Sequence, residues 1–357
     1  MPNKDAFPAF VIVPIYNIKV DKNLLNQVLA DGFSLISKQH FKKEYFEFIK
    51  KNTPVEILNL LNADLFVPDN QLLITRPFAN YVLFKQIKMG KNLNKEEHKN
   101  IMMTIGNTIN YIMLSLRLIQ SGRCQINKCY ILGEWFESSF NLSCSSYLEC
   151  LNTYRYLNKD YIEESDYIID DKIFHQIKPI YSNVKKVYST FLNIPLDYFN
   201  QYYNAYGMFD RIIKLAIVLE SVLLSGDNQE LKYRLSIRAC NILKKDVFDV
   251  FKAFYDIRSA IVHEGNLSDK ECKKLVKFLS QYSNLEFNAN VRSKVLFDFV
   301  NNIIAQLVRE ILLKSIELIT KDNINSLKNL NKFIDNNIVR NISVNIENMK
   351  KEVADAK

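Results

Sequence analysis

A cation and an imidazole stand five residues apart in the segment 255–265, whose sequence is YDIRSAIVHEG. The cation is Arg258, the imidazole is His263, and Ser259 follows the arginine directly. A guanidinium can hold a phosphate group, and an imidazole can accept and return a proton near neutral pH. These two groups are the minimal equipment for breaking a phosphodiester bond without a metal ion.

A helix is predicted to carry these residues, with Asp246 as its N-cap and its end near Gly265. Apolar residues recur at helical spacing along it: Val247, Phe251, Phe254 and Ile261. Arg258 takes the place of the next apolar residue in this stripe. A buried guanidinium needs an anionic partner. Either Arg258 pairs with a carboxylate, for which Glu220 in the apolar segment 209–224 is the candidate, or it lines a cleft and awaits an anion.

The spacing of Arg258 and His263 limits how they could act together. Five helical residues turn through about 500°, so the two side chains lie roughly 140° apart on a regular helix. They converge if the helix ends near His263, which Gly265 favours as a left-handed C-cap, or if a second copy of the helix supplies the opposite wall. A histidine in the last turn also lies at the negative end of the helix dipole, which suits a role in proton transfer.

Composition places the chain among globular proteins. It has 357 residues, enough for two domains, with 48% hydrophobic and 24% charged residues. Only eight glycines and eight prolines occur, so helices are expected to dominate. The formal net charge of +8 suits a polyanionic partner. Six cysteines without a C-x-x-C pair indicate reduced thiols rather than a zinc site, and a cytoplasmic location without membrane insertion is expected.

The predicted fold class is mainly α, with a C-terminal helical bundle and an α+β N-terminal domain. Residues 1–160 form the predicted N-terminal domain, 165–320 the bundle, and 321–357 an Asn-rich C-terminal helix or tail. Strands are predicted at 10–16, 71–78, 80–87 and 129–140, and N-terminal helices at 23–36, 41–50 and 96–120. The bundle helices are predicted at 178–192, 197–207, 209–224, 229–243, 246–263, 268–282 and 291–320.

A basic helix face follows the arginine–histidine segment. Its members are spaced i, i+3, i+4 and i+7: Lys270, Lys273, Lys274 and Lys277. They predict either a track for an RNA backbone or an ordinary solvated helix face.

Three segments together resemble the Apea-like branch of the HEPN superfamily over residues 165–320. They are DRIIKLAIVLE at 210–220, YRLSIRA at 233–239 and YDIRSAIVH at 255–263, and the last matches the R-x4–6-H motif of the family. The resemblance implies an all-α bundle, usually dimeric, in which two such motifs face each other across a cleft. Many members are metal-independent endoribonucleases of toxin, abortive-infection or antiphage systems.

Carried over to this chain, the resemblance implies that Arg258 holds the scissile phosphate. His263 would handle protons while the RNA 2′-OH attacks, leaving a 2′,3′-cyclic phosphate, and Ser259 would orient the phosphate or the histidine. Glu264 departs from this pattern by placing an acid beside the histidine. No family is recognised for residues 1–160, so a sensor or recognition role there is an analogy only.

Two functions are therefore predicted. The first is a metal-independent endoribonuclease without a cofactor, acting on RNA as a homodimer in phage defence or growth arrest, with a neutralising or trigger partner left open. The second is a non-catalytic helical module that binds nucleotide, RNA or a protein partner. In that module Arg258 and His263 are structural, and Glu220 is the ion-pair partner of Arg258.

Overall fold

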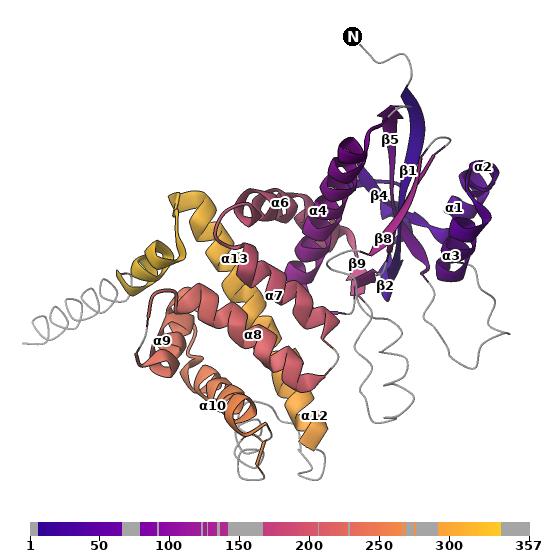
Figure 1. Cartoon of the computed structure of the whole chain (residues 1–357). Helices are drawn as coiled ribbons and strands as arrows, with labels where there is room; N and C mark the ends of the chain where they lie inside the picture. Colours follow the sequence, from indigo (N-terminus) through magenta and orange to yellow (C-terminus); the bar gives the residue numbers. More distant parts are fainter. Residues whose placement is uncertain are drawn as a thin grey trace, which may run out of the picture. The chain divides into compact units, whose positions relative to one another are not determined.

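The computed structural model describes residues 6–65, 79–90, 93–122, 124–126, 128–133, 136–141, 167–205, 207–227, 229–265, 267–268, 275 and 292–336. The chain divides into two compact units, Met1–Val184 and Lys185–Lys357 (Figure 1). The division falls within α6 (Asp171–Tyr188), about 20 residues after the domain boundary predicted at 160–165. The predicted strand at 71–78 lies outside the described residues, as does the helix predicted at 268–282 except for Ser268 and Leu275.

The N-terminal unit is built on an antiparallel sheet of order β3-β4-β5-β1-β7-β8. Its strands are β1 (Ala6–Tyr16), β3 (Val28–Ala30), β4 (Phe33–Ser37), β5 (Tyr81–Gly90), β7 (Lys128–Gly133) and β8 (Phe136–Asn141), and β6 (Gln125–Ile126) pairs with the end of β1. The strands predicted at 10–16 and 80–87 are confirmed. The one predicted at 129–140 is a pair, β7 and β8. Separately, β2 (Ile18–Val20) pairs in parallel with β9 (Tyr167–Ile169).

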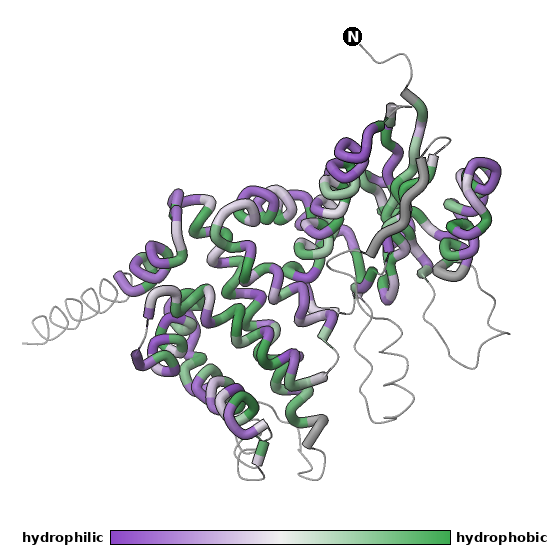
Figure 2. The backbone as a smooth tube through the Cα atoms, viewed as in Figure 1, coloured by the Kyte–Doolittle hydropathy of each residue, from purple (hydrophilic) through white to green (hydrophobic). Residues whose placement is uncertain are grey.

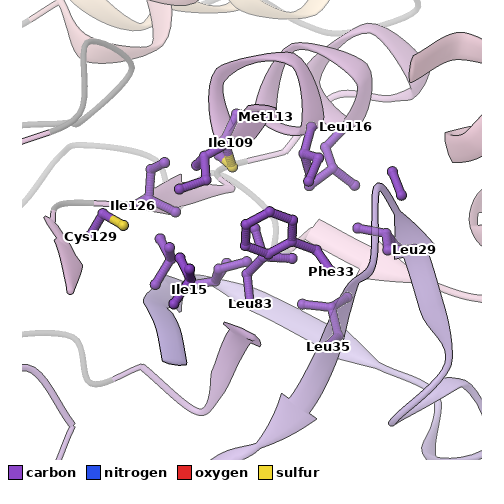
Figure 3. Packing of buried hydrophobic residues seen from close by; sticks show 14 of the residues in the cluster. Ile15, Leu29, Phe33, Leu35, Leu83, Ile109, Met113, Leu116, Ile126 and Cys129 are labelled. Carbon is purple, nitrogen blue, oxygen red and sulfur yellow. The ribbon is translucent and has the colours of Figure 1, made fainter. Parts of the chain in front are cut away.

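Strand β1 is rich in apolar residues, and its side chains at Phe7 and from Ala9 to Tyr16 are buried on both faces of the sheet. One face, with Val11 and Ile15, packs on residues of the long helix α4 (Lys95–Ile119), including Ile109 and Met113 (Figure 3). The other face packs on side chains from three short helices, α1 (Lys38–Glu44), α2 (Phe46–Asn52) and α3 (Val55–Leu65). Two cores therefore lie on either side of one sheet. The helix predicted at 96–120 is confirmed, and the one predicted at 41–50 is two short helices, α1 and α2, divided at Tyr45.

The helix predicted at 23–36 is wrong. This segment contains the short 3-10 helix η1 (Lys22–Leu24) followed by the β3–β4 hairpin. Ala30 pairs with Phe33, and the two residues between them, Asp31 and Gly32, have positive φ angles of 46° and 78°. An Asp-Gly pair with both φ angles positive makes the tight two-residue turn that joins antiparallel strands. This turn determines the structure of the segment 23–36, although its apolar residues are spaced as in a helix.

Tyr181 of α6 joins this hairpin by donating a hydrogen bond to Asp31 Oδ2 at 2.6 Å. Burial, with the Asp31 carboxylate next in importance, raises the pKa of Tyr181 above its ordinary value. Because the folded state keeps the phenol neutral, the stability it contributes is full below about pH 10 and falls as the pH rises further. We expect Tyr181→Phe to lower the free energy of unfolding by about 1 kcal/mol at pH 7, and by less above pH 10. Urea unfolding of both proteins at several alkaline pH values measures this; a constant difference would contradict it.

The C-terminal unit is helical. Its helices are α7 (Asn193–Asn204), α8 (Met208–Leu223), α9 (Leu231–Leu243), α10 (Phe248–Glu264), α12 (Arg292–Phe297) and α13 (Ala305–Asp322), with a π-helical segment η2 (Asp298–Ile304) between the last two. Helix α8 packs against α7, α9, α10 and α13, and hydrophobic residues run along it in Figure 2. The sequence predicted the helix at 291–320 but not its π-helical interior.

Part of the C-terminal segment is a docked helix. Residues 327–336 are helical, and Leu330 and Ile334 are buried. The Asp335 carboxylate receives two hydrogen bonds from Arg238 of α9, at 2.8 and 2.6 Å. Residues 321–357 were predicted to form either a helix or a tail, and residues 327–336 form a helix. Within the described part of the chain, no helix is long and apolar enough to cross a bilayer.

Candidate functional site

Helix α10 carries the predicted arginine and histidine. It begins at Phe248, with Val247 in the N-cap position, so the predicted N-cap at Asp246 is one residue early. The Asp246 carboxylate still accepts a long hydrogen bond from the Phe248 N–H, at 3.5 Å. The helix ends at Glu264, and Gly265 has a φ of 68° and donates its N–H to Ile261 O at 3.1 Å. The predicted glycine C-cap is therefore confirmed.

Arg258 pairs with Glu220 of α8. Its Nη2 lies 3.1 Å from Glu220 Oε1 and donates a hydrogen bond to Oε2 at 3.3 Å. The guanidinium also lies 5.7 Å from the centre of the Tyr255 ring, within reach of a cation–π contact. The structure thus contains the ion pair expected under the first interpretation of Arg258, in which Glu220 is its partner.

The pair is neither fully buried nor fully satisfied. The Arg258 side chain is 25% exposed and that of Glu220 26%. Glu220 Oε1 is itself shielded from solvent and makes no hydrogen bond with the described residues. The contact is therefore not the two-bond fork that makes arginine–carboxylate pairs strongest. A guanidinium that is held by one hydrogen bond and open to solvent can still receive another anion.

His263 lies on a different side of α10. It is exposed, it belongs to the last regular turn, and none of the described residues hydrogen-bonds its imidazole. Because the helix continues through Glu264, its end does not redirect His263 towards Arg258. Within α10 their directions differ by roughly 140°, and Ser259, half-buried, follows Arg258.

Of the other predicted site residues, Lys270, Lys273, Lys274 and Lys277 lie outside the described residues. The segments 210–220 and 233–239 fall in α8 and α9, and each supplies a buried arginine. Arg211 donates to Asn301 Oδ1 of the π-helical segment at 3.1 Å, and Arg238 pairs with Asp227 and Asp335. Both arginines therefore have partners within the bundle.

A groove that the sequence analysis missed lies between α9 and α10. Its volume is about 780 Å³, and its lining includes Glu230, Lys232, Tyr233, Phe248, Lys252 and Tyr255. Tyr255 belongs to this groove and also to the surroundings of Arg258. One signal in the sequence was available: Phe248, Lys252 and Tyr255 follow one another at i, i+4 and i+7, on one helix face.

The part of the chain that the structure describes holds no group of three or more His, Cys, Asp or Glu side chains able to hold a metal ion. Cys124, Cys129 and Cys240 are free thiols, and Cys144, Cys150 and Cys272 lie outside that part. Burial raises the pKa of the Cys240 thiol.

A scan against protein-family models, a search of curated proteins and a search of solved structures each find no match to the chain.

The ion pair predicts a moderate effect on stability. We expect Arg258→Ala to lower the free energy of unfolding by about 1–2 kcal/mol, between the values for exposed and buried pairs, because a quarter of each side chain is exposed. Glu220→Gln should cost a similar amount, and the double variant less than the sum of the two. Urea unfolding measures all three.

The matched control is Asp256→Asn, which breaks the more exposed Lys232–Asp256 pair between α9 and α10 and should cost less than about 0.5 kcal/mol. A loss above about 3 kcal/mol for Arg258→Ala would mark Arg258 as a buried structural ion-pair partner, contrary to this expectation.

Proposed function

We propose that this chain is a metal-independent endoribonuclease of the HEPN type that acts on RNA as a homodimer. The observation that carries the proposal is the geometry of α10. It holds an arginine with an open side and an exposed histidine, five residues apart and on different faces. One helix cannot apply both groups to one phosphate. Two copies related by a two-fold axis can, because each then offers its arginine to the histidine of the other.

In the proposed reaction the scissile phosphate binds the Arg258 guanidinium, either in place of the Glu220 carboxylate or together with it. The guanidinium then stabilises the negative charge that grows on the phosphoryl oxygens. His263 of the second copy takes the proton from the 2′-OH as its oxygen attacks phosphorus. The bond from phosphorus to the 5′-oxygen breaks, and the imidazolium returns the proton to that oxygen. The products are a 2′,3′-cyclic phosphate and a free 5′-OH, with Ser259 placed to orient the phosphate or the histidine.

Charge supports an RNA substrate. Residues 185–357 contain 26 Lys and Arg against 20 Asp and Glu, a formal charge of +6 out of +8 for the whole chain. A basic domain attracts polyanions over distances of about a Debye length. An effector role in phage defence or growth arrest, held in check by a neutralising or trigger partner, belongs to the same proposal.

A second candidate is favoured by the Arg258–Glu220 pair itself. In a non-catalytic module that binds nucleotide, RNA or a protein partner, the pair would join α8 to α10 and His263 would be an ordinary surface residue. The two candidates differ in one observable: only the first makes RNA shorter.

The test is RNA cleavage by the purified chain in the presence of EDTA, together with its mass in solution from light scattering. The proposal expects a dimer whose activity survives EDTA, and products that end in 2′,3′-cyclic phosphate. A strictly monomeric active enzyme, or activity that disappears with EDTA, overturns the proposed mechanism. A folded dimer without nuclease activity favours the second candidate.

A further inference from the structure

The groove between α9 and α10 is separate from the proposed catalytic residues yet adjoins them. Its lining mixes three aromatic side chains with two lysines and one glutamate. Tyr233 is 56% exposed, although large aromatic side chains are usually more buried than this. Its ring meets that of Phe248 edge-on, with centroids 5.6 Å apart. An exposed ring supported by a second ring is a rigid flat surface at the wall of a groove.

The charged groups of the groove are not equivalent. Lys232 is neutralised by Asp256, with Nζ 2.5 Å from Oδ1. Lys252 is exposed, and none of the described residues pairs with it, so its ammonium is the cation available to a ligand. Glu230 has a φ of 52° and does not cap the first turn of α9 with its side chain. The N–H groups of that turn, which lines the groove, add partial positive charge to that of Lys252.

We infer that this groove binds an unpaired nucleotide of single-stranded RNA, with the base stacked on Tyr233 or Tyr255 and a phosphate on Lys252. The inference rests on the proposed function, whose substrate it narrows to RNA with unpaired bases. Flat aromatic faces beside a cation suit a base and its phosphate, because every base has a π-face and every nucleotide a charge. A purely apolar helix, by contrast, would leave the Lys252 ammonium without a partner.

Tyr255 links the groove to the catalytic arginine. It lines the groove, and the Arg258 guanidinium lies over its ring. Along α10, Lys252, Tyr255 and Arg258 follow each other at intervals of three residues, so each side chain is turned about 60° from the one before, and Tyr255 lies between the other two. An RNA strand held at Lys252 and Tyr255 would therefore pass its next phosphates towards Arg258. The groove acts as a positioning site and not as part of the bond-breaking machinery.

The experiment measures binding of a fluorescein-labelled single-stranded RNA, about ten nucleotides long, to the full chain carrying His263→Ala, by anisotropy. Adding Tyr233→Ala should weaken binding about 10-fold, and Tyr233→Phe, which keeps the ring, should restore it. Adding Lys252→Ala should weaken binding and reduce the slope of log affinity against log salt by about 0.7. A double-stranded RNA of the same sequence should be insensitive to Tyr233→Ala, because its bases are already stacked.

Lys186→Ala is the matched control, since Lys186 is also exposed in the same unit but lies outside the groove; it should change little. Affinity that is unchanged by Tyr233→Ala and Lys252→Ala overturns the inference, and a groove that takes a protein partner would give that result. If the wild-type chain still cleaves RNA in that case, the proposed function stands without the groove. If the groove variants lose binding but the wild-type chain does not cleave RNA, the groove stands and the nuclease proposal fails.

Discussion

His263→Ala is expected to reduce single-turnover RNA cleavage by about 100-fold or more while leaving RNA affinity almost unchanged. General acid–base catalysis by a positioned side chain contributes about 10²–10⁴-fold, and the imidazole is the proposed carrier of the proton in both halves of the reaction. The substitution should not disturb folding, because His263 is exposed and none of the described residues hydrogen-bonds it. Product formation from end-labelled RNA, at saturating protein, separates the chemical step from binding.

The matched control is His175→Ala, which removes another exposed helical histidine, on α6, and should leave cleavage unchanged. Cleavage that persists in His263→Ala would exclude His263 as the proton carrier. Arg258→Ala is expected to lose cleavage as well, by weakening both phosphate binding and charge stabilisation.

The two inactive variants make a sharper test when they are mixed. A heterodimer of Arg258→Ala and His263→Ala chains contains one cleft with neither group and one with both, if each cleft takes its arginine and histidine from different chains. Random exchange of subunits should therefore recover about a quarter of the wild-type activity from two inactive proteins. Mixed dimers that form but stay inactive would contradict a site shared in this way.

Arg238→Met is expected to lower the free energy of unfolding of the C-terminal unit by about 3 kcal/mol, with a fall in Tm of about 6–12 °C. The Arg238 side chain is 7% exposed. It pairs with Asp227, holds both carboxylate oxygens of Asp335, and donates to Leu223 O at 2.6 Å. Removing it leaves the Asp335 carboxylate without this cation, leaves Asp227 with Arg234 alone, and takes the donor from the buried Leu223 carbonyl. Thermal unfolding followed by circular dichroism measures the loss.

Arg234→Met is the control, because Arg234 binds the same Asp227 from the exposed side and should cost less than about 1 kcal/mol. In Arg238→Met, amide hydrogen exchange should also become faster over residues 327–336, because their Asp335 no longer holds them to α9. Equal losses for the two arginine variants would mean that the buried position of Arg238 adds nothing.

The sequence predicted the elements that depend on local pattern. Gly265 marks the end of α10, and the interrupted apolar stripe offered Glu220 as one of two possible answers for Arg258, because a buried guanidinium needs an anion. The hairpin at Asp31 and Gly32 was missed although its turn residues were visible, because apolar spacing was given more weight than turn chemistry.

What could not be predicted depends on residues far apart in the chain. The order of the strands joins β1 to β5 and β7, about 70 and 120 residues away, and no local pattern encodes such pairing. The α9–α10 groove forms only when Tyr233 and Phe248 of different helices meet. The direction of His263 follows from one further helical residue, Glu264, at the end of α10.

The Arg258–Glu220 contact makes Glu220 a permanent internal competitor for any anion that approaches Arg258. It is tethered and close, so its effective concentration is high whatever the surroundings contain. A free carboxylate offers Arg258 nothing that Glu220 does not already supply. A polyanion carries neighbouring charges that other cations of the protein can bind at the same time. Replacing Glu220 at Arg258 therefore gains binding free energy for a polyanion but not for a small anion. We therefore expect a polyanion to displace Glu220 from Arg258 more readily than a small anion does.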